Sequence, residues 1–72
     1  MLGYMALKPE KVLNNIKISL NQKGYIKDIP LPVFYAEFMV QTGYGQNKVR
    51  EWAENFELIK LIEIKNKTMN FL

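Results

Sequence analysis

The sequence predicts a small α+β domain of three helices, a short strand and a C-terminal β-hairpin. One observation is an apolar stripe with the i, i+3, i+4, i+7 spacing of an amphipathic helix, formed by Val49, Trp52, Ala53 and Phe56. A second is the alternation of apolar and charged side chains near residues 61–64, which indicates a strand with one buried face. A third is a helical pattern upstream, separated from the stripe by Gly-Tyr-Gly. The predicted order is therefore helix, turn, helix, hairpin.

Length and composition predict one globular domain spanning residues 1–72. Hydrophobic residues make up 49% of the chain, which is enough for a core. A core of this size rarely supplies more than ~3–5 kcal/mol of net stability by itself. The sequence contains no Cys and no His, so it offers neither a disulfide nor a thiolate or imidazole zinc site. We therefore expect self-association, as a homodimer, to contribute to stability.

The termini and hydropathy predict a cytoplasmic protein with no membrane partner. No segment approaches the ~18 consecutive apolar residues of a membrane-spanning helix. Residues 1–7 are apolar but lack the basic start of a signal peptide, and Lys8 and Pro9 follow directly. We expect residues 1–7 to be an N-terminal extension that covers one edge of the core or is disordered, with contact to a second copy as the alternative.

Residues 9–23 are predicted to form the first helix. Pro9 suits the first turn of a helix, where its missing N–H would be unpaired, and Gly24 suits a left-handed cap. The predicted buried stripe comprises Val12, Leu13, Ile16 and Leu20. The lysines of this segment are expected to be a solvated face, and contact with phosphate is the alternative: Lys8, Lys11, Lys17 and Lys23.

A short strand is predicted at residues 25–27 and a second helix at residues 32–42. Pro30 and Pro32 favour an extended chain before that helix. Within it, Phe34 and Phe38 are expected to be core residues rather than the lining of a ligand pocket. Glu37 and Gln41 are expected to face water, and Gly43 is expected to end the helix in the left-handed conformation.

The third helix is predicted at residues 46–58, with Gly45 as its N-cap, and the hairpin at residues 61–72. Asn66 and Lys67 form a two-residue turn, although Gly is preferred at the second position. This register places the apolar residues on one face and the polar residues on the other. The expected pairs are Ile62 with Phe71, Glu63 with Asn70, Ile64 with Met69 and Lys65 with Thr68.

From about residue 34 to residue 72, the sequence resembles the winged helix-turn-helix superfamily of DNA-binding domains. In that family a small residue ends the second helix, an apolar residue six positions later begins the recognition-helix stripe, and a Leu-Ile pair opens the wing. Here these positions are Gly43, Val49, and Leu61 with Ile62. Two departures are Lys60, where the family usually has Gly, and the shortness of the wing.

The resemblance implies that the third helix lies in the major groove of DNA with its N-terminal residues nearest the bases. Its apolar stripe leaves Gln46, Asn47, Arg50 and Glu51 facing outward. Arg can pair with guanine, Gln or Asn with adenine, and Glu can accept from cytosine or repel phosphate. The alternative is an ordinary solvated face with an ion pair between Arg50 and Glu54. The predicted DNA-binding residues are Tyr44, Gln46, Asn47, Lys48, Arg50, Glu51, Lys65 and Lys67.

Charge is distributed unevenly along the chain. Residues 1–30 carry five lysines and two acidic residues, a net charge of +3. Residues 31–60 carry three basic and four acidic residues, a net of −1, and residues 61–72 carry two lysines and one glutamate, a net of +1. This balance motivates a second hypothesis, a protein-interaction module whose acidic surface is formed by Glu51, Glu54 and Glu57.

A third hypothesis is binding of RNA or single-stranded DNA, which requires exposed aromatic side chains. The candidates are Tyr4, Tyr25 and Tyr44. No nucleotide-binding loop, metal motif or catalytic constellation is recognisable, so neither an enzyme nor a cofactor or small-molecule ligand is expected. The favoured prediction is a small dimeric transcription regulator that binds double-stranded DNA.

Overall fold

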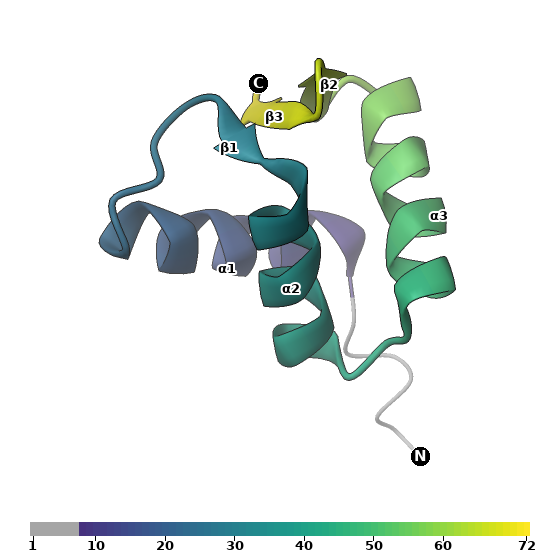
Figure 1. Cartoon of the computed structure of the whole chain (residues 1–72). Coiled ribbons are helices and arrows are strands. Elements are labelled where there is room, and N and C mark those ends of the chain that lie inside the picture. Colours follow the sequence, from purple (N-terminus) through teal and green to yellow (C-terminus); the bar gives the residue numbers. More distant parts are fainter. Residues whose placement is uncertain (1–7) are drawn as a thin grey trace.

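The computed structural model of the chain describes residues 8–72, which form three helices and a three-stranded antiparallel sheet (Figure 1). The strand order in the sheet is β1-β3-β2. The N-terminal extension predicted at residues 1–7 lies outside the described residues. The elements are α1 (Pro9–Gln22), β1 (Ile29–Pro30), α2 (Leu31–Thr42), α3 (Gln46–Leu58), β2 (Ile62–Lys65) and β3 (Thr68–Phe71).

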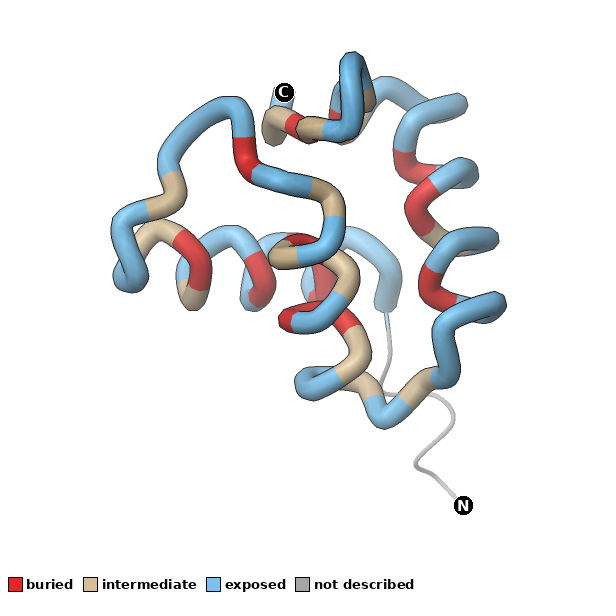
Figure 2. The backbone as a smooth tube through the Cα atoms, viewed as in Figure 1, coloured by how far each residue is buried: buried red, intermediate tan, exposed pale blue. Residues whose placement is uncertain are grey.

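The core is built from the apolar sides of the helices and the inner face of the sheet. Figure 2 shows the buried segments of α3 on the side that faces α2. Of the predicted apolar stripe of α3, Val49, Ala53 and Phe56 are buried, whereas Trp52 is half-buried at the edge of the core. The predicted stripe of α1 is likewise buried, and comprises Val12, Leu13, Ile16 and Leu20.

Helix α2 supplies two fully buried aromatic side chains, Phe34 and Phe38. Their rings meet edge to face, with centroids 5.7 Å apart. Phe38 also stacks on Phe56 of α3 at 6.0 Å, and Phe34 meets Phe71 of β3 at 6.0 Å. Aromatic pairs at these separations contribute about 0.5–1.5 kcal/mol beyond the burial of their area. Phe34 and Phe38 therefore join α2 to both α3 and the sheet.

The hairpin has the register expected from its sequence: Ile62 pairs with Phe71, and Ile64 with Met69. Its turn residues are both left-handed, with φ of 51° at Asn66 and 64° at Lys67. Two successive positive φ values define a type I′ turn, whose twist matches that of the flanking strands. Lys67 therefore occupies a position where Gly would be unstrained.

The short strand lies at Ile29–Pro30, so its prediction at residues 25–27 is wrong. The reason is the end of α1, where the Gly24 N–H donates to Asn21 O and the Tyr25 N–H donates to Leu20 O. This Schellman cap uses the backbone donor that a strand at Tyr25 would need. Ile29 is fully buried and pairs with Met69, whereas Ile26 is 65% exposed.

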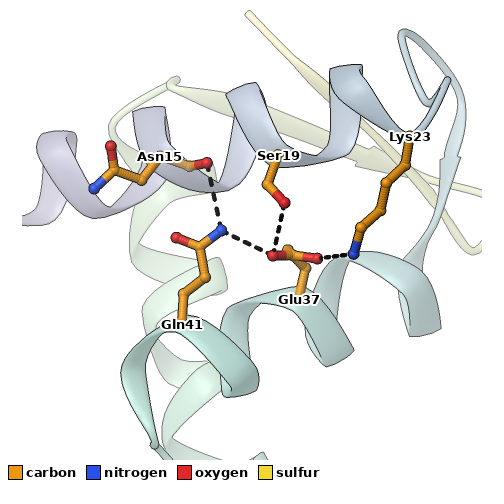
Figure 3. Close-up of polar contacts among 5 residues, drawn as sticks. All are labelled: Asn15, Ser19, Lys23, Glu37 and Gln41. Carbon is orange, nitrogen blue, oxygen red and sulfur yellow. Dashed lines mark hydrogen bonds and ion pairs between the residues drawn. The ribbon is translucent and has the colours of Figure 1, made fainter.

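Glu37 was expected to face water, and this is wrong: it is 8% exposed. Its carboxylate accepts hydrogen bonds from Ser19 Oγ at 2.9 Å, Lys23 Nζ at 2.7 Å and Gln41 Nε2 at 2.8 Å (Figure 3). Ser19 lies in α1, and Lys23, one turn further along the chain, is the C-cap residue of that helix. The hydrogen bonds from Gln41 and Lys23 hold the pKa of Glu37 below its ordinary value, against the opposing effect of burial. Spacing alone did not reveal this polar bridge between helices.

Candidate nucleic-acid interface

The turn between α2 and α3 spans residues 43–45 and has a fixed backbone. Gly43 is left-handed, with φ of 75°, and its N–H donates to Met39 O at 2.8 Å. The Thr42 hydroxyl donates to Phe38 O at 2.7 Å and accepts from the Tyr44 N–H at 3.2 Å. This role of Thr42 was not predicted from the sequence, although a Thr side chain commonly accepts a hydrogen bond from the backbone N–H two residues later in a turn. A three-residue turn with Gly is typical of a helix-turn-helix.

Tyr44 anchors this turn to the aromatic part of the core. Its half-buried ring packs on Trp52 with centroids 5.2 Å apart. Trp52, also half-buried, meets both Phe38 and Phe56 edge to face at 6.0 Å. The start of α3 is thus held by a continuous set of aromatic contacts, which limits the movement of the side chains it carries.

Lys48 is held close to Tyr44, with its ammonium 4.7 Å from the centre of the tyrosine ring. A cation over an aromatic face at an exposed site gains about 0.5–1 kcal/mol. The contact favours a position of Lys48 beside the turn rather than one extended into solvent. The cationic group therefore lies next to the first turn of α3.

The outward side of α3 exposes the predicted polar residues. They are all exposed in the structure: Gln46, Asn47, Lys48, Arg50 and Glu51. Within residues 8–72, Lys23 and Glu37 form the ion pair, and Arg50 forms none. The ion pair between Arg50 and Glu54, one feature of the solvated-face alternative, is therefore not formed, and the guanidinium of Arg50 is exposed.

Charges along α3 increase the positive character of its N-terminus. The first turn contains no acidic residue and the last turn contains no basic residue, the reverse of the pattern that stabilises a helix dipole. Lys48 and Arg50 lie in the N-terminal half, whereas Glu51, Glu54 and Glu57 follow. In addition, Gly45 provides no side-chain cap, so no side chain occupies the backbone donors at this end. The first turn of α3 therefore favours an anionic group such as phosphate.

The two hairpin lysines lie at the other end of α2. The backbone carbonyl of Lys67 accepts from the N–H of Leu31, the first residue of α2, at 2.9 Å. The turn at residues 43–45 follows the last residue of α2, and a 12-residue helix is ~18 Å long. Figure 1 accordingly places the hairpin near the end of α3 and the start of α2. Lys65 and Lys67, both exposed, form a second cationic group separate from the first turn of α3.

The other candidate residues that the structure describes belong to α1 or to the segments beside it. Tyr25 is half-buried at the end of α1, and Tyr4 lies outside the described residues. Lys17 lies over Phe71, with 5.9 Å between its ammonium and the ring centre. In the part of the chain that the structure describes, no group of acidic, His or Cys side chains is arranged to hold a metal ion. No helix of residues 8–72 has the length and apolar character to cross a membrane.

Compared with known proteins, the chain matches no protein-family model, no curated protein and no solved structure.

Proposed function

We propose that this chain is a winged-helix DNA-binding protein, acting in the cytoplasm as a small dimeric transcription regulator. The observation that carries the proposal is the N-terminal end of α3, where Gln46 and Asn47 in the first turn and Arg50 in the second are exposed, and where the helix has no side-chain cap. A helix enters the major groove of B-DNA with its N-terminal residues nearest the base edges. These three side chains have the donors and acceptors needed to read bases.

Each part of the surface has a separate role in the proposal. Arg50 pairs with guanine, while Gln46 and Asn47 pair with adenine. Lys48 and the hydroxyl of Tyr44 bind the phosphates on either side of the groove, which sets the orientation of the helix without reading sequence. The Glu51 carboxylate either accepts a hydrogen bond from cytosine or repels phosphate. In the second case it limits the contact with the duplex to the N-terminal end of α3.

The hairpin acts as a short wing. Lys65 and Lys67 bind flanking phosphates, a contact that adds affinity and salt dependence. Their separation from the first turn of α3 by about the length of α2, ~18 Å, gives the duplex two points of attachment. No catalytic activity is part of this proposal.

Removal of Arg50 tests the function. Arg50→Ala is expected to weaken binding to the preferred duplex by ~1–3 kcal/mol and to relax selection at one base pair. Lys27→Ala is the matched control, since it removes one exposed positive charge from the segment between α1 and β1, away from α3 (Figure 1). Fluorescence anisotropy with a labelled duplex gives both affinities. Equal affinities for Arg50→Ala and the unchanged protein would remove Arg50 from the interface.

A second candidate function is protein interaction through the acidic half of α3. Glu51, Glu54 and Glu57 are all exposed, and this observation favours a basic protein partner. Charge reversal distinguishes the two functions, because Glu54→Lys strengthens attachment to DNA but weakens attachment to a basic partner. Weaker DNA binding by Glu54→Lys would count against the first function.

A further inference from the structure

The outward side of α2 is apolar along its length. Helical spacing places five residues on this side, and they are exposed or half-buried: Pro32, Val33, Ala36, Met39 and Val40. Val40 is 80% exposed, the largest value among the exposed large hydrophobic residues of the described chain. The outward sides of α1 and α3 carry Lys, Asn, Gln, Arg and Glu instead. An apolar helix face on a small protein indicates a surface that a partner covers.

Three of the four polar side chains of α2 are hydrogen-bonded within the chain, and the fourth, the half-buried Tyr35, is not one of the five residues of the apolar side. Glu37 accepts from Ser19, Lys23 and Gln41, and Gln41 also donates to Asn15 O. The Thr42 hydroxyl donates to Phe38 O. Covering the apolar side of α2 therefore leaves none of Glu37, Gln41 and Thr42 without a hydrogen-bond partner, which avoids one cost of burying a surface.

The same surface contains both a hollow and a projection. A hollow of about 360 Å³ lies between the end of α1 and α2, and is lined by Leu20, Lys23, Tyr25, Val33, Ala36, Glu37 and Val40. Val40 borders the hollow and is itself largely exposed. A patch that carries a projection beside a hollow can pack against a copy of itself, because a two-fold axis sets each projection opposite the other hollow.

We propose that this face of α2 binds the same face of a second copy, with the two helices crossing at Ala36. A two-fold contact brings equal charges close together, so a surface with charged residues at its centre repels itself. The outward side of α2 contains no charged residue, and Lys23 at its rim is neutralised by Glu37 at 2.7 Å. Neither α1, with its outward lysines, nor α3, with its three glutamates, meets this condition.

The small side chain of Ala36 allows the two backbones to approach closely, and each Val40 enters the hollow of the other copy. This interface supplies the dimer of the proposed function and in that sense deepens it. This contact also leaves α3 uncovered in both copies, since α3 packs on the opposite side of α2 through Phe38 and Phe56.

Sedimentation equilibrium without DNA tests the interface. The unchanged protein is expected to dimerise, and Val40→Glu to raise the dimer dissociation constant by at least ~100-fold, because it places an unpaired charge in the contact. Leu58→Glu is the matched control: it changes an apolar residue that is 77% exposed near the end of α3, and the dimer should persist. Circular dichroism is expected to show the same helix content in all three proteins.

A single-cysteine variant gives an independent measurement, since the chain has no Cys of its own. Ala36→Cys is expected to be joined into a covalent dimer by a short bis-maleimide reagent at least ~10-fold faster than Leu58→Cys, because a two-fold contact at Ala36 raises the local concentration of the second thiol.

A protein that remains monomeric up to ~1 mM would overturn the proposal. Dimerisation that Val40→Glu leaves unchanged, or that Leu58→Glu abolishes, would also overturn it. Both measurements are made without DNA, so they test the dimer contact of α2 separately from DNA binding. A protein that dimerises but does not bind DNA would contradict the proposed function alone. A monomer that binds DNA would contradict the dimer contact alone.

Discussion

The ammonium of Lys48 lies 4.7 Å from the centre of the Tyr44 ring, and Tyr44 in turn packs on Trp52 at 5.2 Å. A cationic side chain at the start of α3 is thereby connected to the core through two aromatic rings. This arrangement separates two contributions of Tyr44, one from its ring, which positions Lys48, and one from its hydroxyl, which is proposed to bind phosphate.

Tyr44→Phe retains the ring and removes the hydroxyl. We expect DNA affinity to fall by about 1.5 kcal/mol, the lower end for a hydrogen bond to a charged group, with little change in the free energy of unfolding. Tyr44→Ala is expected to reduce both, because it also removes the contacts with Trp52 and Lys48. Anisotropy titrations and urea denaturation followed by the emission of Trp52, the single tryptophan, give the two quantities. Unchanged affinity in Tyr44→Phe would exclude the hydroxyl as a phosphate contact.

Lys67→Gly is expected to change stability and DNA affinity in opposite directions. Lys67 has φ of 64°, which glycine adopts without strain, so the free energy of unfolding should rise by roughly 0.5–1 kcal/mol. The loss of one phosphate contact should reduce the slope of log K against log salt concentration by ~0.9. Salt titrations of the variant and the unchanged protein measure the slope, and identical slopes would show that Lys67 does not contact the duplex.

Lys60→Gly tests the backbone strain at the end of α3, at a residue outside both the proposed DNA-binding surface and the proposed dimer contact. Lys60 has φ of 64° in a Schellman cap, where its N–H donates to Glu57 O and the Leu61 N–H donates to Phe56 O. Gly at this position should increase the free energy of unfolding by roughly 0.5–1 kcal/mol. Lys60→Ala removes the same charge but keeps the strain, so it serves as the control and should not stabilise. Equal urea midpoints for Gly and Ala would contradict this account.

Glu37→Gln is expected to reduce the free energy of unfolding at pH 7 by about 1–3 kcal/mol, since three donors lose their charged acceptor. Folding lowers the pKa of Glu37. The ionised Glu37 carboxylate therefore stabilises the folded protein at pH values above the ordinary carboxyl pKa of ~4.3, and this stabilisation is lost as the pH falls below that value. The difference between the two proteins should therefore shrink in acid. Glu63→Gln, on the exposed side of β2, is the control. If the difference in unfolding free energy between Glu37→Gln and the unchanged protein stayed constant down to pH 2, the ionised Glu37 carboxylate would not be the source of the stabilisation.

The sequence predicted those parts of the fold that depend on short-range patterns. The stripe beginning at Val49 predicts α3, and the alternation around Asn66 predicts the hairpin register, because both patterns repeat with the period of the element. The strand at Ile29 and the burial of Glu37 depend on residues far away in the chain, Met69 for the strand, and Ser19 and Lys23 for the carboxylate. The spacing of residues within one element does not show which distant residues it will contact.

The candidate nucleic-acid interface also has features that follow from short-range patterns and features that depend on packing. Exposure of Gln46, Asn47 and Arg50 follows from helical spacing and is seen in the structure. The contact of Lys48 with Tyr44, and the position of the hairpin lysines at the far end of α2, arise only when the elements pack together. The DNA contacts themselves remain a prediction.

A titration of ¹⁵N-labelled protein with a mixed-sequence duplex at low salt tests whether the N-terminal end of α3 binds DNA. We expect the largest changes in amide chemical shift at residues 44–51 and smaller changes at Lys65 and Lys67, and we expect these changes to diminish as salt is added. Shifts that avoid residues 44–51, or no shifts at a duplex concentration of ~1 mM, would contradict this expectation.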